Sequence, residues 1–271
     1  MEPLYQPFPM QPRHRGQVWR HHPAYWRPRH FHREPELNFV FRGRARMGVG
    51  AHVVEMTAGD GLLLLPGQDH ALLEASSDLE LYVSALDPEV AEHCVHRPLP
   101  TGTACLRLQE KEAERVRGQL HHLTSTADPT QHETIVGDLL SQATSVLAPG
   151  HPVVRKALEQ LGRDPSLDGA ALSQALKVHR SDLGRYVQRD LGVPLVKYRN
   201  RLRLMRFIAR VDDGHTLTSA ALEAGFGSYQ QCHRMFVGHL GCSPRRYFSG
   251  HRRDVDELLA RDAHARAAPP A

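Results

Sequence analysis

The sequence has few cysteines and no long apolar run. Its four cysteines, Cys94, Cys105, Cys232 and Cys242, show no C-x-x-C spacing among 271 residues. A disulfide framework is therefore not indicated, and a reducing cytoplasm is the expected environment. The longest apolar run, Leu62–Pro66, is far shorter than the ~18 residues that a membrane-spanning helix needs.

Signatures of common enzyme classes and of export are also missing. The sequence has no G-x-S-x-G, no phosphate-binding glycine loop and no H-E-x-x-H, so a hydrolase is not expected. The segment Met1–Leu4 lacks a basic stretch followed by an apolar one. No secretory signal and no membrane partner are therefore expected.

What is present suits a folded protein of two domains. Hydrophobic residues make up 41% and aromatic residues 6% of the chain, and its net charge is only +4. The charge is unevenly distributed, because Lys177–Arg210 holds ten Lys or Arg against two acids, Asp182 and Asp190. That segment is either an electrostatic surface for phosphates or the solvated face of helices.

The N-terminal part has the pattern of short strands separated by glycines. Residues 1–28 are rich in Pro, Arg and His and predict an arm with weak local order. The predicted strands are Leu37–Phe41, Ala45–Val49, His52–Met56, Leu62–Leu65 and Glu80–Ser84. Many short strands at this spacing favour a small barrel or sandwich over residues 29–90.

Residues 91–148 favour helices. Segments Gln109–Leu123 and Glu133–Leu147 are separated by a break at Ser125–Pro129. The second predicted helix carries one apolar stripe, formed by Ile135, Val136, Leu139, Leu140, Ala143 and Val146. This stripe either packs on the barrel or contacts the same stripe of a second copy in a homodimer, and the dimer is the preferred interpretation.

Ala148–Pro152 predicts a linker, and the pattern beyond it is helical to about Leu259. The predicted fold class is therefore α+β, with a DNA-binding domain over residues 149–254 and a tail over 255–271. Two segments share one layout, a short helix, a tight turn and a longer helix. The first runs from Ala170–Leu176 into Arg180–Asp190, and the second from Leu217–Ala224 into Ser228–Leu240.

Each longer helix has an apolar face and a polar face. In the first, Leu183, Val187 and Leu191 are expected in the core, whereas Gly184 falls on the opposite face. In the second, Gly225 suits the turn and Ser228 an N-cap. A helix with short polar and Arg side chains can read base edges in a major groove. The predicted DNA-binding residues are Arg180, Ser181, Arg185, Gln188, Ser228, Tyr229, Gln230, Gln231, His233 and Arg234.

Several ordered motifs in this region resemble one family. Ala221–Tyr229, His233–Phe236 and Gly241–Tyr247 are similar to the signature of AraC/XylS-type regulators, and Leu191–Leu195 and Tyr198–Arg203 to the start of that family's connecting helix. The resemblance covers about residues 155–250. It implies two helix-turn-helix units on a rigid helix over Leu195–Val211, inserting into successive major grooves of double-stranded DNA. RNA polymerase is a further candidate partner.

The first unit departs from that pattern. Lys177 stands where the family usually has glycine, and His179 where a Ser or Thr cap is common. Gly184 offers no side chain for base recognition. We therefore expect the first unit to position the protein on DNA and the second unit to discriminate between sequences.

The N-terminal part resembles the two cupin motifs, with His30, His32, Glu36 and Gly43 in the first and Pro66, Gly67 and His70 in the second. The first motif's opening glycine is absent, Leu65 replaces the first proline of the second, and Glu74 stands at its final asparagine position. In metal-binding cupins, the residues matching His30, His32, Glu36 and His70 bind one first-row metal, which imidazole ligands suit. Three interpretations stay open: an organic effector, which is preferred, a single divalent metal, or a purely structural barrel. No cofactor is certain.

The leading hypothesis is therefore a sequence-specific, effector-responsive transcriptional regulator of the cytoplasm and nucleoid. The alternative is a metal-dependent cupin dioxygenase or isomerase with a helical appendage. A third hypothesis, a chromosome-organising protein, predicts no discrimination between DNA sequences. An enzyme has no need of the second helix-turn-helix signature, which favours the regulator. Effector, operator and the direction of regulation are not determined by the sequence.

Overall fold

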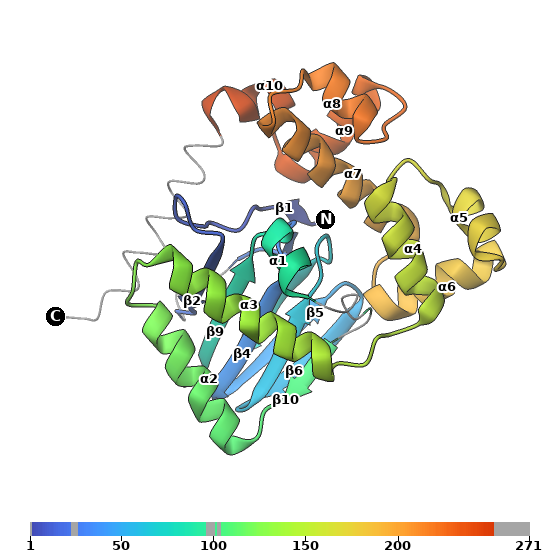
Figure 1. The fold of residues 1–271 in the computed structure, drawn as a ribbon. Coiled ribbons are helices and arrows are strands. Elements are labelled where there is room, and N and C mark those ends of the chain that lie inside the picture. The colour runs from blue at the N-terminus through green and yellow to red at the C-terminus, as the bar shows by residue number, and fades with distance from the viewer. Residues whose placement is uncertain (1, 23–26, 96–100, 102–103, 252–271) are drawn as a thin grey trace.

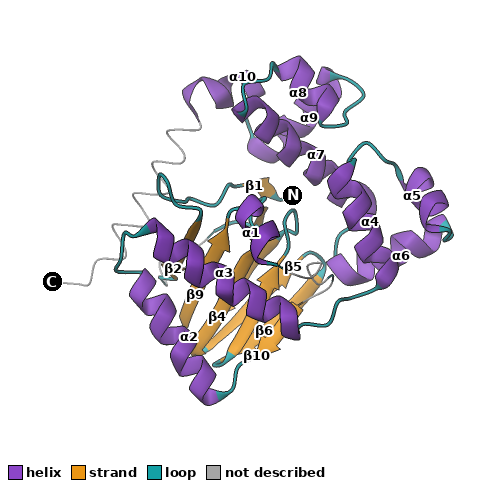
Figure 2. Cartoon of the chain, viewed as in Figure 1, coloured by secondary structure: helices purple, strands orange, loops and turns teal. Residues whose placement is uncertain are grey.

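Two largely antiparallel sheets, with one parallel pair at the edge of the first, form the N-terminal half, and helices form the C-terminal half (Figures 1 and 2). The structure is a computed structural model that describes residues 2–22, 27–95, 101 and 104–251. The α+β class is confirmed. No helix within these ranges is both long and apolar enough to cross a membrane. The predicted tail, residues 255–271, lies outside the described residues.

Each sheet has five strands. In spatial order, the first contains β1 (Leu4–Tyr5), β3 (His30–Phe31), β8 (His70–Ala75), β5 (Arg44–Val49) and β6 (His52–Thr57). The second contains β10 (Ala104–Arg107), β7 (Asp60–Leu64), β4 (Glu36–Arg42), β9 (Glu80–Leu86) and β2 (Gly16–Arg20). Among the described residues the strands make two facing sheets and not one closed barrel, so the prediction of a barrel is corrected to the sandwich alternative.

Residues 1–28 were predicted as a weakly ordered arm, and this prediction is wrong for the two strands that the structure describes there. Gly16–Arg20 pairs along its whole length with β9, and Leu4–Tyr5 pairs with β3. Each of the five residues of β2 has a partner on β9, and Val18 of β2 is buried. The sheets therefore extend beyond residues 29–90 at both ends, because β10 also lies outside that range.

The second sheet is buried on both faces. Side chains alternate along a strand, so Leu37 and Phe39 of β4 face the helices while Val40 faces the first sheet. The helices on this face are α1 (Pro88–Cys94), α2 (Glu110–Leu123) and α3 (Pro129–Val146). Burial of both faces explains why Phe39, Val40 and Phe41 of β4 form an apolar run although their side chains point to alternate faces.

The apolar stripe of α3 packs on this sheet. Val136, Leu139 and Leu140 are buried in the same core as Leu37 and Phe39. The sheet covers these residues, so they pack on it rather than meet a second copy, whereas Val146 at the end of the predicted stripe is exposed. The helix also starts earlier than predicted, because Asp128 caps it.

The C-terminal helices form two units joined by α7 (Leu195–Asp212). The first unit contains α4 (Pro152–Arg163), α5 (Gly169–Leu176) and α6 (Arg180–Leu191); the second contains α8 (Leu217–Glu223), α9 (Tyr229–Leu240), α10 (Pro244–Arg246) and a π-helical turn at Tyr247–His251. Each unit has its own apolar core. Both predicted helix-turn-helix layouts are confirmed, as is the N-cap of α9 by Ser228.

The turn of the first unit places Lys177 in the left-handed region, with φ 53° and ψ 42°. Its peptide N–H donates to the Gln174 carbonyl, which closes the C-terminal end of α5. A side chain with a Cβ is strained in this region, whereas glycine is not. Lysine at position 177, where the family usually has glycine, therefore strains the backbone locally.

We expect Lys177→Gly to raise the free energy of unfolding by about 1 kcal/mol, because it removes this strain. Urea denaturation measures the change. Lys177→Ala is the control, since it removes the long side chain but keeps the Cβ. Equal stability of the Gly and Ala variants would contradict the explanation.

Candidate DNA-binding surface and sensor pocket

The structure places the predicted DNA-binding residues on α6, on α9 and at the N-cap of α9. On α6, Arg180, Ser181 and Arg185 are exposed and Gln188 is half-buried. The outward position Gly184 has open space around it. Arg185 donates to Asp182 one turn earlier, so DNA must compete for this side chain. Contact with DNA remains a prediction for each of these residues.

On α9 two of the predicted residues are engaged in capping. The Ser228 hydroxyl accepts from the Gln231 N–H, and the Gln231 side chain accepts from the Gly227 N–H. These reciprocal bonds satisfy N–H groups at the start of the helix. Tyr229 and His233 lie half-buried with ring centroids 6.0 Å apart.

Arg234 and Gln230 are the exposed long side chains on this face of α9. Within the described part of the chain Arg234 makes no ion pair and no side-chain hydrogen bond. An arginine that is not committed to a neighbour can pair with guanine O6 and N7 in a major groove. Arg234 is therefore the best candidate for base recognition among the predicted residues.

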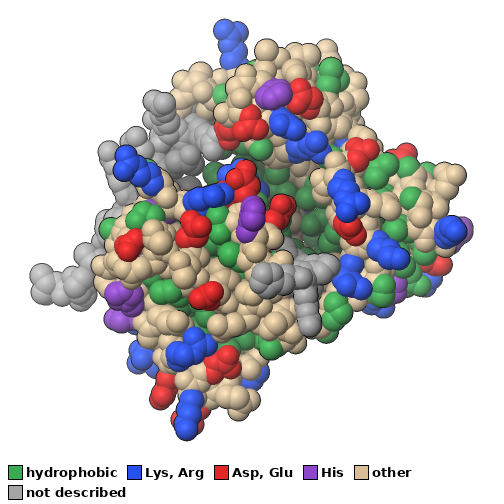
Figure 3. All heavy atoms as spheres, in the orientation of Figure 1, with side chains coloured by type: hydrophobic (Ala, Val, Ile, Leu, Met, Phe, Trp, Pro, Cys, Tyr) green, Lys and Arg blue, Asp and Glu red, His purple; other side chains and the backbone are tan. Residues whose placement is uncertain are grey.

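The basic segment Lys177–Arg210 is not one phosphate-facing surface. Arg201 and Arg203 are buried, and Arg203 donates to the carbonyls of Pro165 and Ser166 at 2.7 and 2.9 Å. Arg203 thus supports packing of α7 and does not contact phosphate. Figure 3 shows acidic and basic side chains mixed on the visible surface of both halves.

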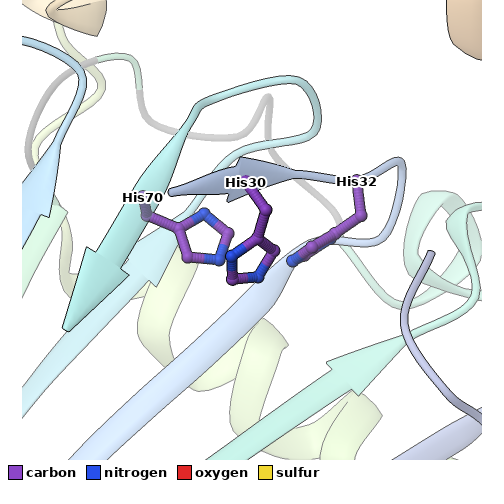
Figure 4. A group of neighbouring side chains, drawn as sticks. All are labelled: His30, His32 and His70. Atoms are coloured by element: carbon purple, nitrogen blue, oxygen red, sulfur yellow. The ribbon is translucent and has the colours of Figure 1, made fainter. Parts of the chain in front are cut away.

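A second candidate site lies between the sheets. The side chains of His30, His32 and His70 converge there, and Figure 4 shows their rings pointing toward one another from β3 and β8. Their candidate ligand atoms all lie within 4.8 Å of one another, and all three side chains are buried. Glu36 Oε2 lies 3.0 Å from His32 Nε2 and 3.7 Å from His70 Nε2. The structure thus brings together all four predicted residues.

Backbone carbonyls determine which nitrogen of each ring faces this point. The Nδ1 atoms lie 2.8 Å from Pro28 O for His30, 2.9 Å from Glu34 O for His32 and 3.1 Å from Gln68 O for His70. A carbonyl only accepts, so each Nδ1 carries the proton and donates. In the neutral ring the lone pair is then on Nε2, the arrangement found in metal-binding histidines.

Burial keeps two of these rings neutral. It lowers the pKa of His70 to about 4 and holds the pKa of His30 well below its usual value. Burial also acts to raise the pKa of Glu36, but the neighbouring His70 and His32 outweigh it and lower that pKa. At neutral pH the site therefore presents imidazole lone pairs and a carboxylate.

This donor set fits a cation. The Nε2 atoms of His30 and His70 are buried and have no hydrogen-bond partner. The short contact between His32 Nε2 and the Glu36 carboxylate requires either a proton on His32 or a bound cation, because two acceptors repel. Three imidazoles and one carboxylate match the ligand preferences of a first-row divalent metal.

A pocket opens above these residues. It measures about 130 Å³, and its walls include Phe8, Trp19, Met47, Leu81 and Val83. Its polar lining comprises Arg20, His21, His22, Arg27, His30, Glu36, Asn38 and His70. The volume suits a small occupant, since drug-sized ligands need cavities of roughly 300–1,000 Å³.

The N-terminal part of this pocket was not predicted from the sequence. Phe8, Trp19 and Arg20 lie in the segment predicted as an arm, and β2 brings two of them to the site. The adjacent Val18 and Trp19, both residue types that favour strands, were the signal that could have revealed β2, although Gly16–Arg20 shows no apolar–polar alternation.

The sequence matches two family profiles. The profile of the AraC-like ligand binding domain matches residues 15–144, and a helix-turn-helix domain profile matches residues 172–250. No curated protein is significantly similar to the chain in sequence.

Solved structures resemble the chain at low identity. ToxT from Vibrio cholerae with bound unsaturated fatty acid is 15% identical over 86% of this chain and 93% of its own, with a TM-score of 0.49. The C-terminal domain of AraT, a response regulator from Geobacillus stearothermophilus, is 19% identical over 37% of this chain and 86% of its own, with a TM-score of 0.36. The AraC-like transcriptional activator CuxR is 12% identical over 72% of each chain, with a TM-score of 0.34.

Fold, pocket and paired helix-turn-helix units define an effector-responsive DNA-binding regulator with an N-terminal sensor domain. The chain belongs to the AraC family of transcriptional regulators.

We expect Arg234→Ala to weaken binding to a preferred DNA sequence by about 1–3 kcal/mol and to relax the preference at one base position. Affinities for preferred and scrambled DNA at several salt concentrations measure this. Arg203→Ala is the contrasting variant, and it should lower the melting temperature, since it leaves two backbone carbonyls without their donor. Proportional loss on both DNAs, with Arg234→Ala still folded, would assign Arg234 to phosphate instead.

Proposed function

We propose that this regulator binds promoter DNA sequence-specifically through α6 and α9 and changes its binding in response to a ligand in the sensor pocket. The observation that carries this proposal is the pair of helix-turn-helix units whose polar helix faces are exposed. The pocket, with apolar walls and a floor of histidines, supplies the place for a small effector.

We further propose that one divalent metal belongs to this pocket, held by His30, His32, His70 and Glu36. The unpartnered Nε2 atoms and the adjoining carboxylate support it. A metal there supplies a Lewis acid to an effector that enters the pocket. The chain itself contributes the apolar walls, which exclude water, and the backbone carbonyls, which orient the imidazoles.

An enzyme built on the same four residues is the alternative function. The ligand set would serve a cupin dioxygenase or isomerase equally well, so the metal does not discriminate. The two family profiles describe regulator domains and not enzymes. Turnover of small organic acids by the metal-loaded protein would favour the enzyme, whereas sequence-selective DNA binding without turnover favours the regulator.

The proposal includes a homodimer acting in the cytoplasm at the nucleoid, with RNA polymerase as a further partner at the promoter. A protein that acts on DNA is expected where the DNA lies, which supports the location at the nucleoid. Val136, Leu139 and Leu140 of the α3 stripe are covered by the sheet, but Val146 at its end is 73% exposed and lies beside edge strand β10. These features favour contact with a second copy near that sheet edge.

Protein purified after metal-supplemented expression should contain about one divalent metal per chain, and His32→Ala should lose it. Elemental analysis measures the content. His93→Ala, which changes an exposed histidine of α1, is the control and should keep the metal. A content near zero in the unaltered protein would leave the pocket to an organic ligand alone.

Sedimentation should detect a dimer at tens of micromolar protein, roughly the range in which a moderate self-affinity becomes populated. Val146→Glu should shift the protein toward monomer, because it places a charge on the exposed apolar end of α3. A monomer at all concentrations, with and without DNA, would exclude the dimer.

A further inference from the structure

The strand that carries two of the pocket histidines also contacts the DNA-binding half. Along β3 and its continuation, His30 and His32 point toward His70, and Phe31 between them packs in the core of the second helix-turn-helix unit. Phe31 is fully buried, 5.2 Å from the ring of His239 and 5.1 Å from the Arg201 guanidinium. Alternation along a strand therefore gives this segment two functional faces.

The loop before His70 makes a second contact with the DNA-binding half. Tyr198 of α7 donates its hydroxyl to Pro66 O at 2.9 Å. Arg201, one turn further along α7, donates to Gly67 O at 3.1 Å and to the Asp69 carboxylate at 2.6 Å. Arg201 and Asp69 are both buried, so this ion pair is shielded from water.

The same loop reaches the end of the first recognition helix. The Gln68 side chain donates to Leu191 O of α6 at 3.1 Å. Beside it, the Ala51 N–H donates to Gly192 O at 2.8 Å. Gly192 has a φ of +69°, and a Cβ there would lie 2.8 Å from the Ala51 nitrogen. The close approach of the two backbones therefore depends on glycine at this position.

Hydrogen bonds join these contacts directly to the histidines. The Gly67 N–H donates to His32 O at 2.8 Å, which ties the loop to the end of the β3 segment. His70 Nδ1 donates to Gln68 O, and Gln68 in turn holds Leu191. The ligand residues and the DNA-binding half thus share one continuous network.

Among the described residues, the hydrogen bonds from the sensor half to the recognition helices fall at the C-terminal ends of these helices. Leu191 ends α6, and His239, which donates to Pro3 O at 2.8 Å, lies in the last turn of α9. Arg180 and Ser181 at the start of α6, and Arg234 on α9, stay exposed. Docking therefore positions both units without covering the residues predicted to contact bases.

We infer that this protein is a metal-responsive regulator. A divalent metal bound by His30, His32, His70 and Glu36 holds β3 and the 66–69 loop in the positions that dock both helix-turn-helix units. The inference rests on the metal site of the proposed function. A metal that draws the four side chains together restrains the backbones carrying them. The docked arrangement, in which the two recognition helices have a set separation, is then favoured, and DNA binding tightens.

A DNA fragment is first selected by the protein from a random library. The affinity of the full chain for this fragment is then measured with and without Zn²⁺. We expect Zn²⁺ to tighten binding at least about fivefold, the lower end of typical coupling between sites. Arg201→Gln should still bind about one Zn²⁺ per chain, but its affinity change should fall below about twofold. Arg210→Gln is the matched control and should respond as the unaltered protein does, because its ion pairs, to Asp213 and Glu223, lie within the second unit.

Tyr198→Phe keeps the ring and removes only the hydrogen bond to Pro66, so it should fold and show a reduced response. Hydrogen exchange at the Ala51 amide reports docking itself, and Zn²⁺ should slow it in the unaltered protein and less so in Arg201→Gln. One bound Zn²⁺ with no change in DNA affinity, or with the same change in Arg201→Gln, would overturn the inference. Failure to bind Zn²⁺ at all would instead overturn the metal site on which it rests.

Discussion

The orientation of three imidazole rings by backbone carbonyls is the constraint on which the sensor pocket depends. Because His30, His32 and His70 each donate through Nδ1, their Nε2 atoms face the same point, and those of His30 and His70 present lone pairs there. The rings are buried and two of them are held neutral, so the pocket floor attracts cations and repels other acceptors. Hydrogen bonds to fixed peptide groups therefore determine which ring nitrogens face the ligand before it enters.

The second sheet provides the rigid support for that floor. It is covered by helices on one face and by the first sheet on the other, so Glu36 and Asn38 project from a strand with little freedom to move. The Asn38 amide donates to Glu36 Oε1 at 2.7 Å, which leaves Oε2 directed at the histidines. Along β4, side chains that pack in the core therefore alternate with the polar side chains of the pocket.

The DNA-binding half combines local capping with long-range docking. Caps at Asp168, His179, Thr216 and Ser228 start α5, α6, α8 and α9 where short-range sequence dictates. Docking on the sensor half depends on buried contacts such as Arg201 to Asp69, whose partners are 132 residues apart. Removing one partner of such a pair leaves a buried charge, so this interface is sensitive to single changes.

The sequence by itself determined the α+β class, most strand and helix positions in the two halves, both helix-turn-helix units and the four residues of the pocket floor. These features depend on periodicity, caps and motif spacing, which are local. Only the tertiary structure decided that residues 16–20 complete a sheet, that the α3 stripe is covered, and that Arg203 is buried rather than facing DNA. It also placed Phe31 and Asp69 against α7. Each of these outcomes depends on partners far away in the chain. The pattern of apolar and polar residues within one segment cannot identify such partners.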